Sequence, residues 1–145
     1  MRKYRRPSSK KIVLNISHAP ATPMCTVHIG SVRTKAVIDT GADCSVIRHD
    51  IYKRIPHKYI LSTSELKNSP CVSATGNSLD INCKASFRFR VGPVLLEHTF
   101  MVAKNLKKPL ILGSDFLDAN RTEIQFHKKQ MVLMALKTFK DSKSN

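Results

Sequence analysis

Residues 36–43 have the sequence Ala-Val-Ile-Asp-Thr-Gly-Ala-Asp, in which an apolar run ends directly at an acid, Asp39. Apolar residues resume at Val46 and Ile47, so the turn is predicted to lie between two buried strands. Asp and Gly are common turn residues, and an ordinary Asx-turn is therefore an alternative interpretation. The segment predicts a carboxylate held at the end of a buried strand.

Alternation of apolar and polar residues on both sides of this turn predicts β-strands. The clearest case is 83–91, where Cys, Ala, Phe, Phe and Val alternate with Lys, Ser, Arg and Arg. One face of this strand is apolar and the other is basic, as in an antiparallel strand with one face in water. Strands are also predicted at 12–16, 24–29, 34–38, 44–47, 94–103 and 110–112, and in a last hairpin of 122–126 and 130–136.

Helices are expected at only two places, and both are short. One helical turn is predicted near 50–54, ended by Pro56. Ser114 is expected to cap a second helix that runs through Asn120, with Asp115 in its first turn. Because the chain has no long helical pattern and no internal repeat, the sequence predicts an all-β domain.

A second motif lies downstream at residues 110–117, Leu-Ile-Leu-Gly-Ser-Asp-Phe-Leu. Together with the Asp-Thr-Gly turn it resembles the retropepsin family, the aspartic proteases of retroviruses and long-terminal-repeat retrotransposons. The form Ile-Leu-Gly-x-Asp-Phe-Leu is closer to the retrotransposon type. The resemblance spans about residues 24–136. It implies a single acid-protease lobe, a closed β-barrel-like fold with a flap hairpin and one short C-terminal helix, that forms a homodimer.

The chemistry of this family needs two carboxyls. Like charges about 3 Å apart cannot both ionise, so two such carboxyls share one proton. The charged one acts as general base on a water molecule, while the protonated one polarises the scissile carbonyl. Two-lobed relatives carry both acids on one longer chain, whereas this chain of 145 residues contains Asp-Thr-Gly once. The resemblance therefore implies a homodimer in which each copy supplies Asp39 beside a two-fold axis.

The resemblance also assigns roles to the residues around Asp39. Thr40 is expected to hydrogen-bond across the dimer axis to its counterpart, and Gly41 to let a backbone N–H approach the carboxylate. Asp39, Thr40 and Gly41 are thus the expected catalytic residues. Ala42 and Asp43 resemble positions that contact the backbone of the substrate.

A mobile flap over the cleft is a further element that the resemblance implies. The candidate is the segment 70–81, with its turn at 74–77, where a Gly-Asn pair suits the positive φ angles of a tight hairpin. An ordinary surface hairpin is the alternative. Ala74, Thr75 and Gly76 are expected to contact the substrate. Closure of the flap would hold an extended peptide by strand-like hydrogen bonds.

Other positions are compared with the family in the same way. Retroviral members often carry Arg after the Gly of the second motif, where this chain has Ser114, which leaves open whether Asp43 has an ion-pair partner. The flap segment also lacks the multiple glycines of compact retroviral flaps. Gly113 is expected to support the Asp39 turn from behind, and the hairpin 122–136 is the candidate for the sheet between the two copies.

The net charge of +15 is the most unusual feature of the composition. Residues 1–11 are predicted to form a basic, disordered arm, residues 12–136 the protease domain, and residues 137–145 a polar tail. The arm suits weak electrostatic contact with nucleic acid or an anionic surface, and a solvated tail or linker is the alternative. Its positive charges are Arg2, Lys3, Arg5, Arg6, Lys10 and Lys11.

Cysteine and histidine spacing does not predict a metal site. The four cysteines form no Cys-x-x-Cys pair, and the six histidines form no His-Glu-x-x-His pattern. We expect most of the cysteines to be small buried residues, and we expect no cofactor. No apolar run approaches the ~20 residues of a membrane span, and the basic start precedes no apolar signal core. We therefore expect a cytoplasmic protein in a reducing compartment, with virus-like particles as one setting, or a segment excised from a longer precursor.

These observations favour an aspartic endopeptidase that hydrolyses extended polypeptide segments, including a polyprotein and its own flanks. The first alternative is a catalytically silent retropepsin-like module for dimerisation or binding. The second is a basic nucleic-acid-binding protein, which the charge alone favours, because the chain lacks zinc-knuckle spacing, a Gly-rich phosphate loop and aromatic platforms. The intact Asp39, Thr40 and Gly41 favour the protease.

Overall fold

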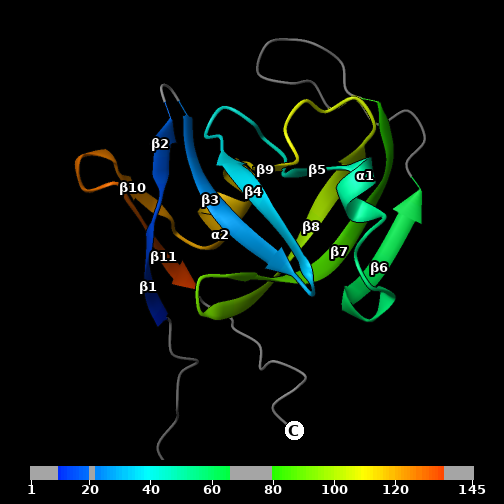
Figure 1. Cartoon of the computed structure of the whole chain (residues 1–145), viewed down its shortest axis with the longest axis horizontal. Coiled ribbons are helices and arrows are strands. Elements are labelled where there is room, and N and C mark those ends of the chain that lie inside the picture. Colours follow the sequence, from blue (N-terminus) through cyan, green and yellow to red (C-terminus); the bar gives the residue numbers. More distant parts are fainter. Residues whose placement is uncertain (1–9, 20–21, 66–79, 136–145) are drawn as a thin grey trace, which may run out of the picture.

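The computed structural model describes residues 10–19, 22–65 and 80–135 (Figure 1). These residues form an eight-stranded sheet, a three-stranded sheet and two short α-helices, so the all-β prediction is confirmed. No helix in this part of the chain is long and apolar enough to span a membrane.

The large sheet closes on itself. Six strands follow one another in the order β3, β4, β9, β5, β8 and β7, and β7 pairs again with β3 through Val27 and Val91. The predicted closed barrel is therefore confirmed. Strands β2 and β6 extend it at the two ends of the eight-strand order. The bounds are β2 Ser17–Ala19, β3 Thr22–Ile29, β4 Val32–Ile38, β5 Val46–Arg48, β6 Ile60–Glu65, β7 Ile81–Val91, β8 Val94–Ala103 and β9 Leu110–Leu112.

Aromatic rings of β7 and β8 fill the barrel. Phe87, Phe89 and Phe100 are fully buried, and the rings of Phe87 and Phe100 stack with their centroids 4.6 Å apart. Each such side chain contributes roughly 1.5–3 kcal/mol by its burial. The alternation predicted for this segment is confirmed, because residues 85, 87, 89 and 91 are buried and the basic residues between them face outward.

Strand β9 brings the two sequence motifs together. It lies between β4, to which it is parallel, and β5, to which it is antiparallel. Because parallel strands end at the same edge, the turn after Ile38 and the turn after Leu112 lie side by side. The active-site candidate is thus placed at this edge of the barrel.

The last predicted hairpin belongs to the smaller sheet. Strands β10 (Glu123–Gln125) and β11 (Gln130–Ala135) pair in antiparallel fashion around the 3₁₀ turn η2 (Phe126–Lys128). Strand β1 (Lys10–Asn15) pairs with the other edge of β11. It begins two residues before the expected start of the domain. Figure 1 shows this sheet on the opposite side of the barrel from β6.

Both helices lie where the sequence predicts them, but the residue that caps the second helix differs from the prediction. Helix α1 (His49–Tyr52) lies at the predicted helical turn, followed by the 3₁₀ turn η1 (His57–Tyr59). Helix α2 (Ser114–Ala119) is the predicted C-terminal helix. The prediction that Ser114 caps it is wrong. Gly113 is the capping residue, because its carbonyl already accepts hydrogen bonds from the N–H groups of Phe116 and Leu117.

Strand β6 was not predicted from the sequence. Its residues are mostly exposed, so they carry no alternation of apolar and polar side chains. The strand forms because its backbone pairs with β7, from Ile60 opposite Phe87 to Glu65 opposite Cys83.

Candidate active site

Asp39 begins the turn that follows strand β4. Its backbone N–H donates a hydrogen bond to the Leu112 carbonyl at 3.0 Å, which ties the turn to β9. The N–H of Gly41 donates to the Asp39 carboxylate oxygen Oδ1 at 2.9 Å, and the N–H of Ala42 donates to the Asp39 carbonyl at 3.2 Å. The turn is therefore an Asx-turn, as the alternative interpretation requires, but one that holds a carboxylate at the mouth of the barrel.

The Asp39 carboxylate is oriented by one of its two oxygens. Gly41 holds Oδ1, while Oδ2 makes no hydrogen bond to the residues that the structure describes. Asp39 is partly exposed, and the Thr40 side chain beside it is exposed. Within the described part of the chain, one carboxylate oxygen is therefore bound and the other has no partner.

Gly113 lies directly against the back of this turn. A Cβ atom at this position would approach the carbonyl oxygens of Ala42 and Cys44 to 2.7 Å each. The N–H of the next residue, Ser114, donates to the same Ala42 carbonyl at 2.7 Å. Only glycine fits this close contact between two backbone segments, and Gly113 supports the turn from behind as expected.

Of the other predicted site residues, the structure describes some and not others. Asp43 is exposed and makes no ion pair with residues 10–19, 22–65 or 80–135. Ser114 offers it no positive charge. The predicted flap contacts, Ala74, Thr75 and Gly76, lie outside the described residues. At the C-terminal end of the flap segment, the N–H of Asp80 donates to Asn105 Oδ1 at 2.6 Å.

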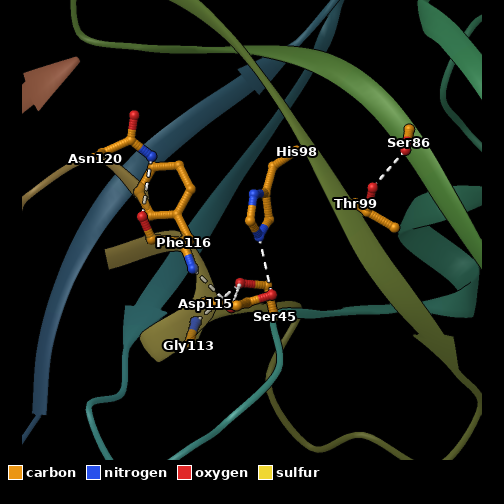
Figure 2. Close-up of polar contacts among 8 residues, drawn as sticks. All are labelled: Ser45, Ser86, His98, Thr99, Gly113, Asp115, Phe116 and Asn120. Atoms are coloured by element: carbon orange, nitrogen blue, oxygen red, sulfur yellow. Dashed lines mark hydrogen bonds and ion pairs between the residues drawn. The ribbon is translucent and has the colours of Figure 1, made fainter. Parts of the chain in front are cut away.

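A polar cluster that the sequence did not predict lies behind the turn (Figure 2). Ser45 donates its hydroxyl to Asp115 Oδ1 at 2.7 Å, and the same hydroxyl oxygen accepts the N–H of Gly113 at 3.0 Å. His98 Nε2 lies 2.9 Å from Asp115 Oδ2. Figure 2 shows His98, from β8, and Ser45, from the active-site loop, both directed at the Asp115 carboxylate.

The sequence contains no recognisable pattern that predicts this cluster. Asp115 belongs to the second motif, but its expected role was only to begin a helix. Ser45 and His98 lie far from it along the chain and form no recognisable spacing with it. Strands β8 and β9 both pair with β5, and this pairing brings His98 to the start of α2.

Burial and hydrogen bonding act in opposite directions on Asp115. Its partial burial raises the pKa of its carboxyl, but hydrogen bonds from His98 and Ser45 outweigh burial and lower the pKa below the usual value of 3.8. The carboxylate therefore remains charged in moderately acidic solution. The imidazole of His98, whose side chain is 14% exposed, meets the rings of Phe100 and Phe116 edge to face.

The described cysteines differ in exposure. Cys25 is buried, and its burial raises the pKa of its thiol to about 12. This thiol is therefore an unreactive small core residue, as expected. Cys44, in the active-site loop, and Cys83 are partly exposed, and none of the three is in a disulfide.

Comparisons with known proteins agree with this geometry. The sequence model of the family described as retroviral aspartyl protease matches residues 19–125, which is more than half of the chain. A search of curated proteins finds no match.

Solved structures with the same fold come from several kinds of organism. EIAV protease in complex with the inhibitor HBY-793 has a TM-score of 0.54 and 22% identity, over 70% of this chain and 90% of that one. The retroviral protease-like domain of Ddi1 from Leishmania major has a TM-score of 0.52 and 14% identity, over 84% and 96%. A retropepsin-like aspartic protease from Rickettsia conorii has a TM-score of 0.53 and 16% identity, over 92% and 96%.

The structural likeness shows the fold, and the match over residues 19–125 shows the family. Both agree with the Asp-Thr-Gly turn at the barrel edge and with the glycine-containing strand end packed behind it. This chain belongs to the retroviral aspartyl protease family.

Proposed function

We propose that this chain is an aspartic endopeptidase that is active as a homodimer. One observation carries the proposal: Asp39 has one carboxylate oxygen bound by the Gly41 N–H and the other without a partner among the described residues. Two such turns facing each other would place two half-oriented carboxyls in position to share one proton. That pair can activate water and protonate the leaving amine.

Each copy contributes one half of the site in this mechanism. The ionised Asp39 takes a proton from water as the water attacks the scissile carbonyl, and the protonated Asp39 polarises that carbonyl. Thr40 of each copy is proposed to hydrogen-bond across the axis, for which its exposed position is suitable. The N–H of Gly41 binds Oδ1 of Asp39 and is proposed to orient the carboxylate toward its counterpart in the other copy.

The substrate is proposed to be an extended polypeptide, including polyprotein segments and the flanks of this chain. Ala42 and Asp43 follow Asp39 in the same turn and are the proposed contacts to substrate backbone. The segment 70–81, with Ala74, Thr75 and Gly76, is the proposed flap. It lies in the connection between β6 and β7, which are antiparallel neighbours in the large sheet.

The three-stranded sheet is the proposed contact between the two copies. Strand β10 is at its edge, and two large apolar side chains near that sheet are exposed. Val13 on β1 is 49% exposed and Phe126 after β10 is 55% exposed. A second copy would remove such side chains from water, which favours dimerisation.

The experiment is cleavage of a mixed peptide library by the wild type and by Asp39→Asn over a range of protein concentrations. Asp118→Asn, which changes an exposed acid on α2, is the matched control. We expect cleavage by the wild type and the control that rises faster than linearly with concentration, and none by Asp39→Asn. Absence of cleavage at concentrations where sedimentation shows a dimer would instead favour a silent binding module.

A further inference from the structure

Four consecutive residues at the end of β9 and the start of α2 hold the active-site loop. The Leu112 carbonyl accepts the N–H of Asp39, and the N–H of Ser114 donates to Ala42. Between them, the N–H of Gly113 donates to the Ser45 hydroxyl, which in turn donates to Asp115. The loop from residue 39 to residue 45 is thus bound at its start, its middle and its end.

The last of these contacts depends on Asp115, whose carboxylate is itself held from outside the loop. Its Oδ1 accepts hydrogen bonds from Ser45 and from the N–H of Phe116, the latter at 2.8 Å. Its Oδ2 contacts His98 Nε2 at 2.9 Å. The aromatic rings around His98 leave its imidazole little freedom to turn, so strand β8 determines where the carboxylate of Asp115 lies.

We propose that His98 is a positioning residue for Asp39, acting through Asp115 and the Ser45 hydroxyl. The inference rests on the proposed protease function. With its Oδ2 partner removed, the Asp115 carboxylate turns away from Ser45, and the hydroxyl that accepts the Gly113 N–H loses its own acceptor. The backbone contacts that hold Asp39 against Leu112 then loosen.

The size of the effect follows from the geometry that the reaction requires. A catalytic group must be held to within about 0.5 Å, and supporting contacts outside the reacting atoms commonly change activity by roughly 10-fold or more. His98 does not touch the reacting atoms, so its loss lowers kcat and leaves peptide binding nearly unchanged.

Two substitutions of His98 distinguish the loss of its hydrogen bond to Asp115 from the loss of side-chain volume at this position. His98→Gln carries an amide N–H at about the reach of imidazole Nε2, whereas His98→Asn carries the same amide one methylene short. The control is Thr99→Ala, the next residue on β8, whose side chain contacts Ser86 on β7 (Figure 2).

The measurement is kcat and KM at concentrations at which each variant is a dimer. We expect His98→Asn to lower kcat about 10-fold with KM within about twofold, and His98→Gln and Thr99→Ala to remain near the wild type. An unchanged kcat in His98→Asn, or an equal loss in His98→Gln, would overturn the proposal.

If His98→Asn does not fold, Asp115→Glu moves the carboxylate instead. The same fall in kcat is then expected, and an unchanged kcat would overturn the proposal.

Amide hydrogen exchange separates this proposal from the proposed function. If the wild type cleaves no peptide, the protease proposal fails, and exchange at the N–H groups of Asp39, Gly113 and Ser114 still tests the positioning role. Faster exchange in His98→Asn than in His98→Gln supports that role. Equal exchange in the wild type and both variants contradicts it.

Discussion

The backbone N–H of Asp39 donates to the carbonyl of Leu112 at 3.0 Å, which is one of the hydrogen bonds that join the two sequence motifs. The bond continues the parallel pairing of β4 and β9 by one residue beyond Ile38. It places the acid at the edge of the barrel while its backbone remains part of the sheet. The backbone of Asp39 is thus held by the sheet, as the proposed pair of carboxyls sharing a proton requires.

Gly113→Ala is expected to lower the free energy of unfolding by about 3 kcal/mol, at the upper end for overpacking. The added Cβ would lie 2.7 Å from two backbone carbonyl oxygens, Ala42 O and Cys44 O, which cannot move independently of the loop. Urea unfolding measures the change. Ser31→Ala, in an exposed turn, is the control and should stay within about 0.5 kcal/mol. A loss as small as that of the control would contradict the contact.

Ser45→Ala is expected to cost about 1–3 kcal/mol of stability, because the buried N–H of Gly113 loses its acceptor. The matched control is Ser86→Ala, which removes a surface hydroxyl that also contacts another side chain, Thr99. Its cost should be below about 0.5 kcal/mol. Thermal unfolding of both variants in the same buffer gives the comparison, and equal shifts would refute the assignment.

The pH dependence of stability should carry the contribution of Asp115. Its pKa in the folded protein is lowered, so its contribution is fully present above the ordinary aspartate pKa and disappears as pH falls through the folded value. The stability difference between the wild type and Asp115→Asn should therefore be larger at about pH 5 than below about pH 4. Urea midpoints at several pH values test this. A stability difference that grows as the pH falls would contradict the lowered pKa of Asp115.

Val13→Glu is expected to weaken the dimer while the monomer stays folded. Val13 is exposed on β1 in the sheet that we propose as the interface, and a buried charge there would be costly. Leu61→Glu is the control, because Leu61 is a similarly exposed apolar residue on β6, on the far side of the barrel (Figure 1). Sedimentation should show at least about a tenfold rise in dissociation constant for Val13→Glu only. Equal changes in the dissociation constant for Val13→Glu and Leu61→Glu would contradict the proposed interface.

Much of the barrel was predictable because its strands are amphipathic. In segments such as 83–91, the alternation of apolar and polar residues predicts both a strand and the face that is buried. The structure confirms both predictions. Strand β6 was missed because its exposed side chains carry no such pattern. The capping role of Ser114 was predicted wrongly, because a capping preference does not reveal that Gly113 supplies the first helical carbonyl.

The sequence by itself determined the local chemistry of this protein: the Asp-Thr-Gly turn after an apolar strand, the glycine that ends the second motif, and the all-β class. These depend on neighbouring residues, for which periodicity and turn preference suffice. The tertiary structure alone decided which distant groups meet. Pairing of β5 with β9 brings Ser45 to Gly113, and pairing of β5 with β8 brings His98 to the same place, so these contacts depend on strand pairing across the fold rather than on spacing along the chain.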